Sequence, residues 1–333
     1  MEISLLSRKI LRDLCTNSRS TVTELAAKYG ITRKMVRSRI TALEKEFGLK
    51  YTLELDYEKL GFLPLHIVKI RFLRRVRIED LRSAFANDRL VQFAATTKGD
   101  FEMLVFILAK RSKEYFLWET TLWESLARYG IGTTSSEVTV AHLGFVPVNQ
   151  KSIMASDVGD IYKRMLAVLN ENSRITMREL GKRVGISDGL AKYHLRKLDE
   201  TGIVKRYTTI VTKPTMQYNI VYFMNYTIRE NVLARVRNER RTMYWTEPKE
   251  FPLLSEFQMM FSTTGGEVSF TWATYNDYND GMKRSVRTHE RIYKVDSPVA
   301  QCARIENVVV GLMPLRNLDQ KENYDLTLGG LGV

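Results

Sequence analysis

The chain has 333 residues, 44% of them hydrophobic and 27% charged, which fits a folded globular protein of two to four modules. Its net charge of +13 makes polyanions the expected partners, nucleic acid first and an anionic membrane surface second. The two cysteines, Cys15 and Cys302, lie far apart, so we expect a reducing cytoplasm and neither a disulfide framework nor a cysteine zinc site. No secretory signal is visible, and the longest apolar run, Met103–Ala109, is too short to span a membrane, so we expect a soluble, intracellular protein with nucleic acid and no membrane as its partner.

The first fifty residues predict three helices. The first is amphipathic, with apolar side chains every three or four positions. Thr21 and Glu24 form a capping box that starts a short second helix, and Gly30 is placed for its left-handed C-cap. Thr32 can cap a third helix over residues 33–47. Three helices with a short turn between the second and third have the layout of a helix-turn-helix.

After this module the apolar periodicity changes from helical to strand-like. The order of elements is β-α-β-β-α-β, the split arrangement of a ferredoxin-like sheet with helices on one face. The predicted strands cover residues 65–73, 90–97, 101–109 and 136–143, and the predicted helices cover 77–86 and 115–129.

The same series returns 155 positions later. Thr176 and Glu179 rebuild the capping box, Gly185 occupies the turn, and Ser187 caps a helix over residues 188–201. A second β-α-β-β-α-β pattern follows, with strands at 220–228, 256–263, 267–273 and 303–312 and helices at 231–240 and 277–291.

We therefore predict an α+β chain in which two winged helix-turn-helix domains alternate with two ferredoxin-like (βαββαβ) domains. The expected boundaries are 1–60 for the first winged helix-turn-helix, 61–148 for the first ferredoxin-like domain, 156–213 and 214–316 for the second pair, and 317–333 for a C-terminal tail.

This pairing of domains resembles the leucine-responsive/AsnC (feast/famine) family of transcription regulators. The resemblance covers residues 3–145 well and 158–313 more loosely, and it includes the hairpin sequence "TTKGDFEMLVFIL". It implies a winged helix-turn-helix joined to a ligand-sensing and assembly domain. The family normally carries one such unit per chain and dimerises, so the fused chain is expected to act as an intrachain pseudo-dimer or as a homodimer.

The resemblance also implies an effector site at the two Gly-Asp-type hairpins. Gly99 and Asp100 form the first, and Gly266 and Glu267 occupy the corresponding positions of the second. An amino-acid-like effector is one interpretation, and glycines that merely permit tight turns are the other. The segment 243–251 is a further hypothesis, as a docking loop for basal transcription machinery.

The residue pattern of the predicted helix 33–47 indicates how the chain would bind double-stranded DNA. If its apolar stripe faces the core, the opposite face presents Lys34, Arg37 and neighbouring polar groups to the major groove. Arg37 is the candidate for a bidentate guanine contact, and Arg33, Lys34 and Arg39 are candidates for phosphates. Asp188 would repel phosphates in the second copy, so the first copy should be the sharper reader.

The predicted DNA-contacting residues include a basic wing after each third helix. They are Thr32, Arg33, Lys34, Arg37, Ser38, Arg39, Thr41 and Lys50 in the first copy, and Ser187, Lys192, Tyr193, His194, Arg196, Lys205 and Arg206 in the second.

The sequence offers little support for catalysis. It has no P-loop, its four histidines lack a second ligand at metal spacing, and no acid–base pair stands out. We therefore expect no catalytic residues, no metal and no cofactor, and we expect a sequence-specific transcription regulator. The alternative is an enzyme that resembles the siroheme decarboxylases, which would need His66, Arg71, Arg74 and His142 to converge on a cleft.

Overall fold

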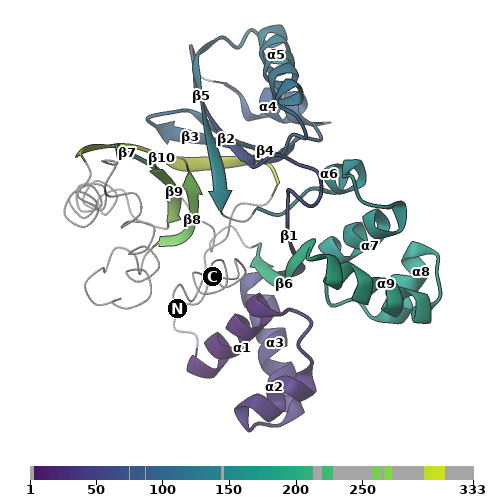
Figure 1. Cartoon of the computed structure of the whole chain (residues 1–333). Coiled ribbons are helices and arrows are strands. Elements are labelled where there is room, and N and C mark those ends of the chain that lie inside the picture. The colour runs from purple at the N-terminus through teal and green to yellow at the C-terminus, as the bar shows by residue number, and fades with distance from the viewer. Residues whose placement is uncertain are drawn as a thin grey trace. The chain divides into compact units, whose positions relative to one another are not determined.

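The computed structural model describes residues 4–74, 76–86, 88–143, 146–212, 220–227, 257–263, 266–271 and 296–311. Contacts divide the chain into two compact units, which are described separately (Figure 1). The helix-turn-helix unit comprises Met1–Leu63, Leu108–Tyr115 and Val146–Met216, and the sheet unit comprises Pro64–Ile107, Phe116–Phe145 and Gln217–Val333. No helix among the described residues is long and apolar enough to cross a membrane.

The helix-turn-helix unit contains two trihelical modules. Module 1 consists of α1 (Leu5–Thr16), α2 (Val22–Tyr29) and α3 (Arg33–Phe47); module 2 consists of α7 (Asp160–Glu171), α8 (Met177–Val184) and α9 (Asp188–Thr201), preceded by the short α6 (Gln150–Ala155). The third helices have the bounds predicted from the sequence.

Local chemistry explains where the helices begin and end. The Thr21 hydroxyl accepts the Glu24 backbone N–H while the Glu24 side chain accepts the Thr21 N–H, so the predicted capping box is present. Gly30 closes α2 in the left-handed conformation at φ +62°, and Gly185 closes α8 in the same way at φ +80°. These turns set the angle between the second and the third helix of each module.

Each module has a compact apolar core. In module 1, Leu14, Leu25, Val36 and Ile40 are at most 7% exposed. The corresponding core of module 2 contains the buried residues Met165, Leu169, Leu180, Ala191 and Leu198. Because these side chains come from all three helices of each module, burial fixes the inward face of α3 and of α9.

The strands that follow the third helices pair with each other. β1 (Leu49–Leu55) and β6 (Val204–Val211) form an antiparallel two-stranded sheet in which Thr52 lies opposite Thr208. The sequence predicts two separate DNA-binding wings here, and the structure instead joins the modules through these strands (Figure 1).

The first helices reinforce this pairing by crossing to the strand of the other module. The Thr208 hydroxyl of β6 donates to the Cys15 carbonyl of α1 at 2.7 Å. The Thr52 hydroxyl of β1 bonds to the carbonyl oxygen of Asn170 in α7 at 2.9 Å. The two modules therefore form a pseudo-dimer within one chain.

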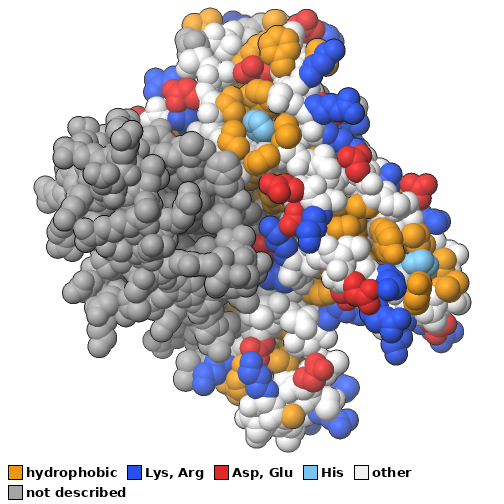
Figure 2. Space-filling view, in the orientation of Figure 1, with side chains coloured by type: hydrophobic (Ala, Val, Ile, Leu, Met, Phe, Trp, Pro, Cys, Tyr) orange, Lys and Arg blue, Asp and Glu red, His pale blue; other side chains and the backbone are white. Residues whose placement is uncertain are grey.

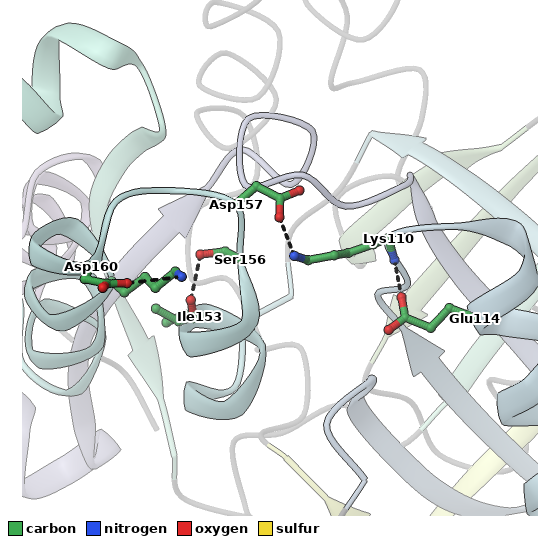
Figure 3. Close-up of polar contacts among 7 residues, drawn as sticks. Lys110, Glu114, Ile153, Ser156, Asp157 and Asp160 are labelled. Atoms are coloured by element: carbon green, nitrogen blue, oxygen red, sulfur yellow. Dashed lines mark hydrogen bonds and ion pairs between the residues drawn. The ribbon is translucent and has the colours of Figure 1, made fainter.

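The segment Leu108–Tyr115 belongs by its contacts to the helix-turn-helix unit, although the sequence analysis assigns it to the first ferredoxin-like domain. Figure 3 shows Lys110, which forms an ion pair with Asp157 and whose backbone N–H donates to Glu114 at 2.7 Å. Asp157 in turn donates its backbone N–H to the Leu60 carbonyl at 2.9 Å. These bonds tie the segment to the connection between α6 and α7.

The first half of the sheet unit has the predicted β-α-β-β-α-β order. Its elements are β2 (Leu65–Phe72), α4 (Ile78–Phe85), β3 (Val91–Gly99), β4 (Met103–Ile107), α5 (Ser112–Arg128) and β5 (Thr133–Leu143). The strands lie in the order β3-β4-β2-β5, all antiparallel, as in a ferredoxin-like sheet. The two helices contribute Leu81, Phe85, Trp118, Leu122 and Leu126 to the buried core.

The second half repeats this strand order and closes the sheet into a barrel. β7 (Ile220–Thr227), β8 (Phe257–Thr263), β9 (Gly266–Thr271) and β10 (Asp296–Val310) lie in the order β8-β9-β7-β10. β5 pairs with β8 and β10 pairs with β3, so the two ferredoxin-like sheets are joined at both edges. The predicted helices 231–240 and 277–291, the loop 243–251 and the tail 317–333 lie outside the described residues.

A buried lysine links the two halves of the barrel. Lys69 of β2 is 4% exposed, and its Nζ lies 2.6 Å from Glu137 of β5. The same Nζ donates to Gln301 of β10 and lies 4.7 Å from the ring centroid of Phe223 of β7. Because its partners come from both halves, Lys69 is part of one shared core.

Candidate nucleic-acid interface

The outward face of α3 carries the polar and basic side chains that the sequence predicts there. Arg33, Lys34, Arg37, Ser38 and Thr41 are all exposed. Val36, Ile40, Leu43 and Phe47 are at most 7% exposed on the opposite face. A helix with a fixed apolar face and a free basic face can enter a major groove without disturbing its module.

Two further predicted residues of module 1 have structural partners. The Thr32 hydroxyl accepts the Met35 backbone N–H at 3.2 Å, so it serves as the N-cap of α3. Arg39 is half-buried and donates to Ser4 at 2.8 Å and Ser7 at 3.0 Å. Arg39 therefore holds α3 against α1, and the phosphate contact predicted for it must compete with these bonds.

The outward face of α9 has a different chemistry. Lys192, Tyr193 and Arg196 are exposed, and the Arg196 guanidinium lies 5.9 Å from the Tyr193 ring centroid. Arg196 also lies 3.9 Å from Glu200, which offsets part of its charge. The predicted Ser187 is the N-cap of α9, where its hydroxyl accepts the Leu190 N–H at 3.3 Å.

His194 belongs to an aromatic cluster and does not stand on the predicted reading face. Its ring centroid lies 5.9 Å from that of Tyr162 and 5.3 Å from that of Tyr193. Figure 2 shows this surface of module 2 as an apolar patch around a histidine, bordered by basic side chains. Leu190 and Tyr193, which are about half exposed, contribute to its apolar character.

The predicted wing residues are largely engaged between the modules. Arg206 is 14% exposed and forms an ion pair with Glu54, which is 10% exposed, so its charge is already neutralised. Lys50 is half-buried, and burial lowers its pKa while Glu171 opposes that shift. Lys205 remains 48% exposed, 3.7 Å from Asp56. The phosphate contact predicted for Arg206 does not fit this arrangement, because β1 and β6 use the surface that a free wing would present.

The two candidate reading helices, α3 and α9, differ in formal charge. α3 carries five Lys or Arg residues and two Glu residues, whereas α9 carries three basic and three acidic residues. Asp188 stands at the position where α3 has Arg33, and it is exposed. Since phosphate attraction depends on net positive charge, α3 is the stronger candidate for the DNA-binding surface.

The first pair of predicted effector residues, Gly99 and Asp100, has a structural role where β3 pairs with β10. Gly99 has φ +152°, and a Cβ there would collide with the Cys302 carbonyl oxygen. The Asp100 N–H donates to that carbonyl at 2.9 Å, and the Cys302 N–H donates to the Asp100 carboxylate at 2.7 Å. Of the second pair, Gly266 lies opposite Asn225 and Thr263 in the sheet, and Glu267 follows it in β9. The first hairpin thus fastens β3 to β10.

The three described residues of the proposed decarboxylase site do not converge. His66 lies opposite Val140 on the same face of β2 as the buried Val68, while Arg71 lies on the other face. Arg74 donates to the Gly130 carbonyl. Burial lowers the pKa of His66. The side chain of His142 lies outside the description, and the described residues contain no group of three His, Cys, Asp or Glu that could hold a metal.

Sequence comparison identifies the trihelical modules. A family described as winged helix-turn-helix DNA-binding matches residues 3–46 and again residues 160–205. The proline dehydrogenase transcriptional activator of Rhodobacter capsulatus is 33% identical over 112 residues, which cover 32% of this chain and 72% of the relative. An uncharacterised HTH-type transcriptional regulator of Pyrococcus furiosus is 32% identical over 115 residues, which cover 34% of this chain and 76% of the relative.

Structure comparison matches the whole architecture. The crystal structure of the siroheme decarboxylase NirDL superimposes with a TM-score of 0.61 and covers 98% of this chain and 100% of that chain. The sequences are only 12% identical, so this likeness establishes the shared fold alone. It shows that two helix-turn-helix modules and two ferredoxin-like sheets occur in one chain elsewhere.

The duplicated helix-turn-helix and the ferredoxin-like strand order define a DNA-binding protein of the α+β class. The chain belongs to the leucine-responsive/AsnC family of transcription regulators.

Proposed function

We propose that the chain regulates transcription in the cytoplasm by binding an asymmetric operator, with α3 as the main reading helix and α9 as a weaker one. The free basic face of α3 carries this proposal. Within the described part of the chain, no ion pair engages Arg33, Lys34 or Arg37. All three are exposed next to a helix N-terminus, where base contacts in the major groove usually originate.

The asymmetry follows from the chemistry of the two faces. Arg37 can donate two hydrogen bonds to one guanine, whereas the equivalent Lys192 is a point charge without that planar fork. The neutral balance of α9 gives less attraction to phosphates than the positive balance of α3. We therefore expect one half-site with strong sequence preference and one with weak preference.

The test selects bound DNA from a randomised library with the purified full chain, and then compares two matched double variants. Lys34→Glu/Arg37→Glu should reduce affinity for the selected DNA at least about 100-fold, since two basic contacts become repulsive. Lys192→Glu/Arg196→Glu should reduce it about tenfold or less. Failure of the wild type to enrich any sequence would refute the function, and equal losses in the two variants would refute the asymmetry.

We also propose that the chain is a regulator without catalytic activity. The whole-chain likeness to a siroheme decarboxylase is the observation that favours an enzyme. In the sheet unit, His66 and Arg71 lie on opposite faces of β2, and Arg74 donates to the Gly130 carbonyl, so these side chains do not form such a site together. Purified protein mixed with an iron-containing tetrapyrrole should show no shifted absorbance band, and a stoichiometric band with release of carbon dioxide would reverse this conclusion.

We also propose two further contacts of the chain, one with an amino-acid-like effector and one with basal transcription machinery. The first hairpin closes the barrel, so an amino-acid-like effector bound there would have to act on the bonds between Asp100 and Cys302. Calorimetric titration with the twenty amino acids tests this, and Asp100→Ala is the matched variant. Deleting residues 243–251 tests the basal-factor contact, because promoter activation should fall while DNA affinity stays unchanged.

A further inference from the structure

The two modules meet at a repeated tripeptide. The sequence "NSR" occurs at residues 17–19 and again at 172–174, in the turn that follows the first helix of each module. The structure places these turns against each other, with the hydroxyl oxygens of Ser18 and Ser173 at 2.5 Å. Both serines are fully buried, so the contact lies at the centre of the pseudo-dimer.

The arginine of each tripeptide crosses to the other module. Arg19 donates from Nη1 to the Ser173 carbonyl at 2.6 Å. Arg174 donates from Nη1 to the Ser18 carbonyl and, at 3.2 Å, to the Ser20 carbonyl. The exchange is reciprocal, as in an isologous interface between two subunits.

Each crossed arginine also stacks on a tyrosine of the module it reaches. The Arg174 guanidinium lies 5.1 Å from the ring centroid of Tyr51 in β1, and that of Arg19 lies 5.5 Å from the ring centroid of Tyr207 in β6. Such cation–π contacts are stronger when partly desolvated, and both arginines are half-buried.

The tyrosines connect this contact to the reading helices. The Tyr51 hydroxyl donates to Glu44 in the last turn of α3 at 2.7 Å. The Tyr207 hydroxyl donates to Asp199 near the end of α9 at 2.6 Å. Each reading helix is therefore joined through one tyrosine to an arginine of the opposite module.

This network favours arginine. A planar guanidinium can donate to a carbonyl from its edge while its flat face stacks on a ring, whereas an ammonium group is a compact point charge without a flat face. Placing the charges here has a cost, because burial lowers the pKa of Arg19 and the nearby Arg174 lowers it further, while Tyr207 and Asp199 oppose the shift. Two arginines on a solvated surface would not need these carbonyl and tyrosine partners.

We propose that Arg19 and Arg174 are positioning residues that fix the separation and orientation of α3 and α9, and thereby the permitted spacing between the two half-sites of the operator. This inference rests on the DNA-binding function proposed above. Helices that enter successive major grooves need half-sites about 10–10.5 base pairs apart. Changing the spacing by one base pair rotates the second half-site by about 35° around the duplex, which a rigid pseudo-dimer does not tolerate.

The experiment measures affinity for the selected operator and for versions with one or two base pairs inserted or deleted between the half-sites. The wild type should lose at least about tenfold in affinity for a change of one base pair. Arg19→Lys/Arg174→Lys should bind all spacings within about threefold, with unchanged affinity for each isolated half-site. Arg178→Lys, an exposed arginine of α8 outside the network, is the control and should behave as the wild type.

Two single variants keep the test decisive if the double variant does not fold. Tyr51→Phe and Tyr207→Phe retain the ring and remove the hydroxyl that reaches Glu44 or Asp199, and each should relax the spacing preference partially. Folded variants that keep the full spacing preference would overturn the inference, and so would a wild type that binds all spacings equally. Absence of any enriched DNA would instead refute the proposed function, so the two failures are distinguishable.

Discussion

Arg37 and Lys34 are neighbours on one exposed face, yet their chemistry predicts different losses. Arg37→Ala removes the proposed bidentate base contact, so discrimination at one operator position should fall by about 1–3 kcal/mol. Lys34→Ala removes the proposed phosphate contact, so binding to specific and random DNA should weaken about equally. Titrations of the operator and of single-base variants measure both quantities. Equal losses on specific and random DNA for Arg37→Ala would contradict its assignment.

The thiol of Cys15 reports on the contact between the modules. Burial raises the pKa of Cys15 to about 11 from 9.0, with Arg206 acting in the opposite direction, and the sulfur lies 3.7 Å from the Thr209 carbonyl of β6. Because the thiolate is the reactive form of cysteine, a pKa of about 11 in place of 9.0 slows alkylation at pH 8 about 100-fold.

The measurement uses the Cys302→Ser variant, in which Cys15 is the remaining cysteine. Reaction with iodoacetamide should be about 100-fold slower in the native protein than in urea. The same pKa shift means that this group stabilises the fold below pH 9 and loses that contribution as the pH rises toward 11. Native reaction at the rate of the unfolded chain would show that α1 and β6 separate readily.

Individual residues also show the limit of reasoning from the sequence. The 100° periodicity gives the correct buried and exposed faces of α3, because burial and helical geometry are local properties. It does not reveal that Arg39 bonds to Ser4 and Ser7, or that Arg206 is neutralised by Glu54, because those partners lie 32 to 152 positions away. The NSR repeat was the signal that could have located Arg19 and Arg174.

At the scale of elements, replacing two glycines of module 2 with alanine should change the stability of the protein in opposite directions. A Cβ on Gly181 of α8 would lie 2.7 Å from the Ile186 carbonyl oxygen, whereas a Cβ on Gly189 of α9 would meet nothing within 4 Å. Gly181→Ala should therefore destabilise the protein by about 1–3 kcal/mol. Gly189→Ala should stabilise it by about 0.5–1 kcal/mol through its helix propensity.

Urea unfolding followed by far-ultraviolet circular dichroism measures both changes. Ala26→Gly is a useful companion, because Ala26 occupies in α2 the position of Gly181 and is already buried. A stabilising Gly181→Ala would show that the turn between α8 and α9 relaxes more easily than this geometry implies.

The strands were easier to predict than their partners. The strand-like patterns locate β2, β3, β4 and β5 within a few residues: apolar alternation marks β2, and a continuous apolar run marks β4, which is buried on both faces. The pairing of β1 with β6 joins Thr52 to Thr208, and the pairing of β10 with β3 joins Ala303 to Gly99. Strand propensity carries no information about such distant partners, so separate wings and separate sheets were the natural expectation.

At the scale of the sheet unit, Lys69 tests whether the two halves of the barrel share one core. Lys69→Ala should destabilise the protein by about 2–4 kcal/mol, because it removes buried volume and leaves Gln301 without its donor. Lys69→Met fills most of that volume and should cost less. Lys113→Ala, at an exposed position of α5, is the control.

The pH dependence of the stability tests the ion pair between Lys69 and Glu137 directly. The hydrogen bond from Lys69 lowers the pKa of Glu137 below 4.5, so the pair stabilises the fold above that pH and is lost as the pH falls. The unfolding midpoint of Lys69→Met should therefore decline less steeply in acid than that of the wild type. Equal acid sensitivity in the two proteins would contradict this role.

The intrachain pairing of β1 with β6 has a consequence for regulation in the cell. Two reading modules on separate chains come apart on dilution, so their joint occupancy of a promoter rises with a higher power of copy number. Here the partner is always present at the high effective concentration set by the covalent connection. Where one chain acts alone at a promoter, its occupancy below saturation therefore rises linearly with expression, and mutations can adapt one half to a new sequence without altering the other.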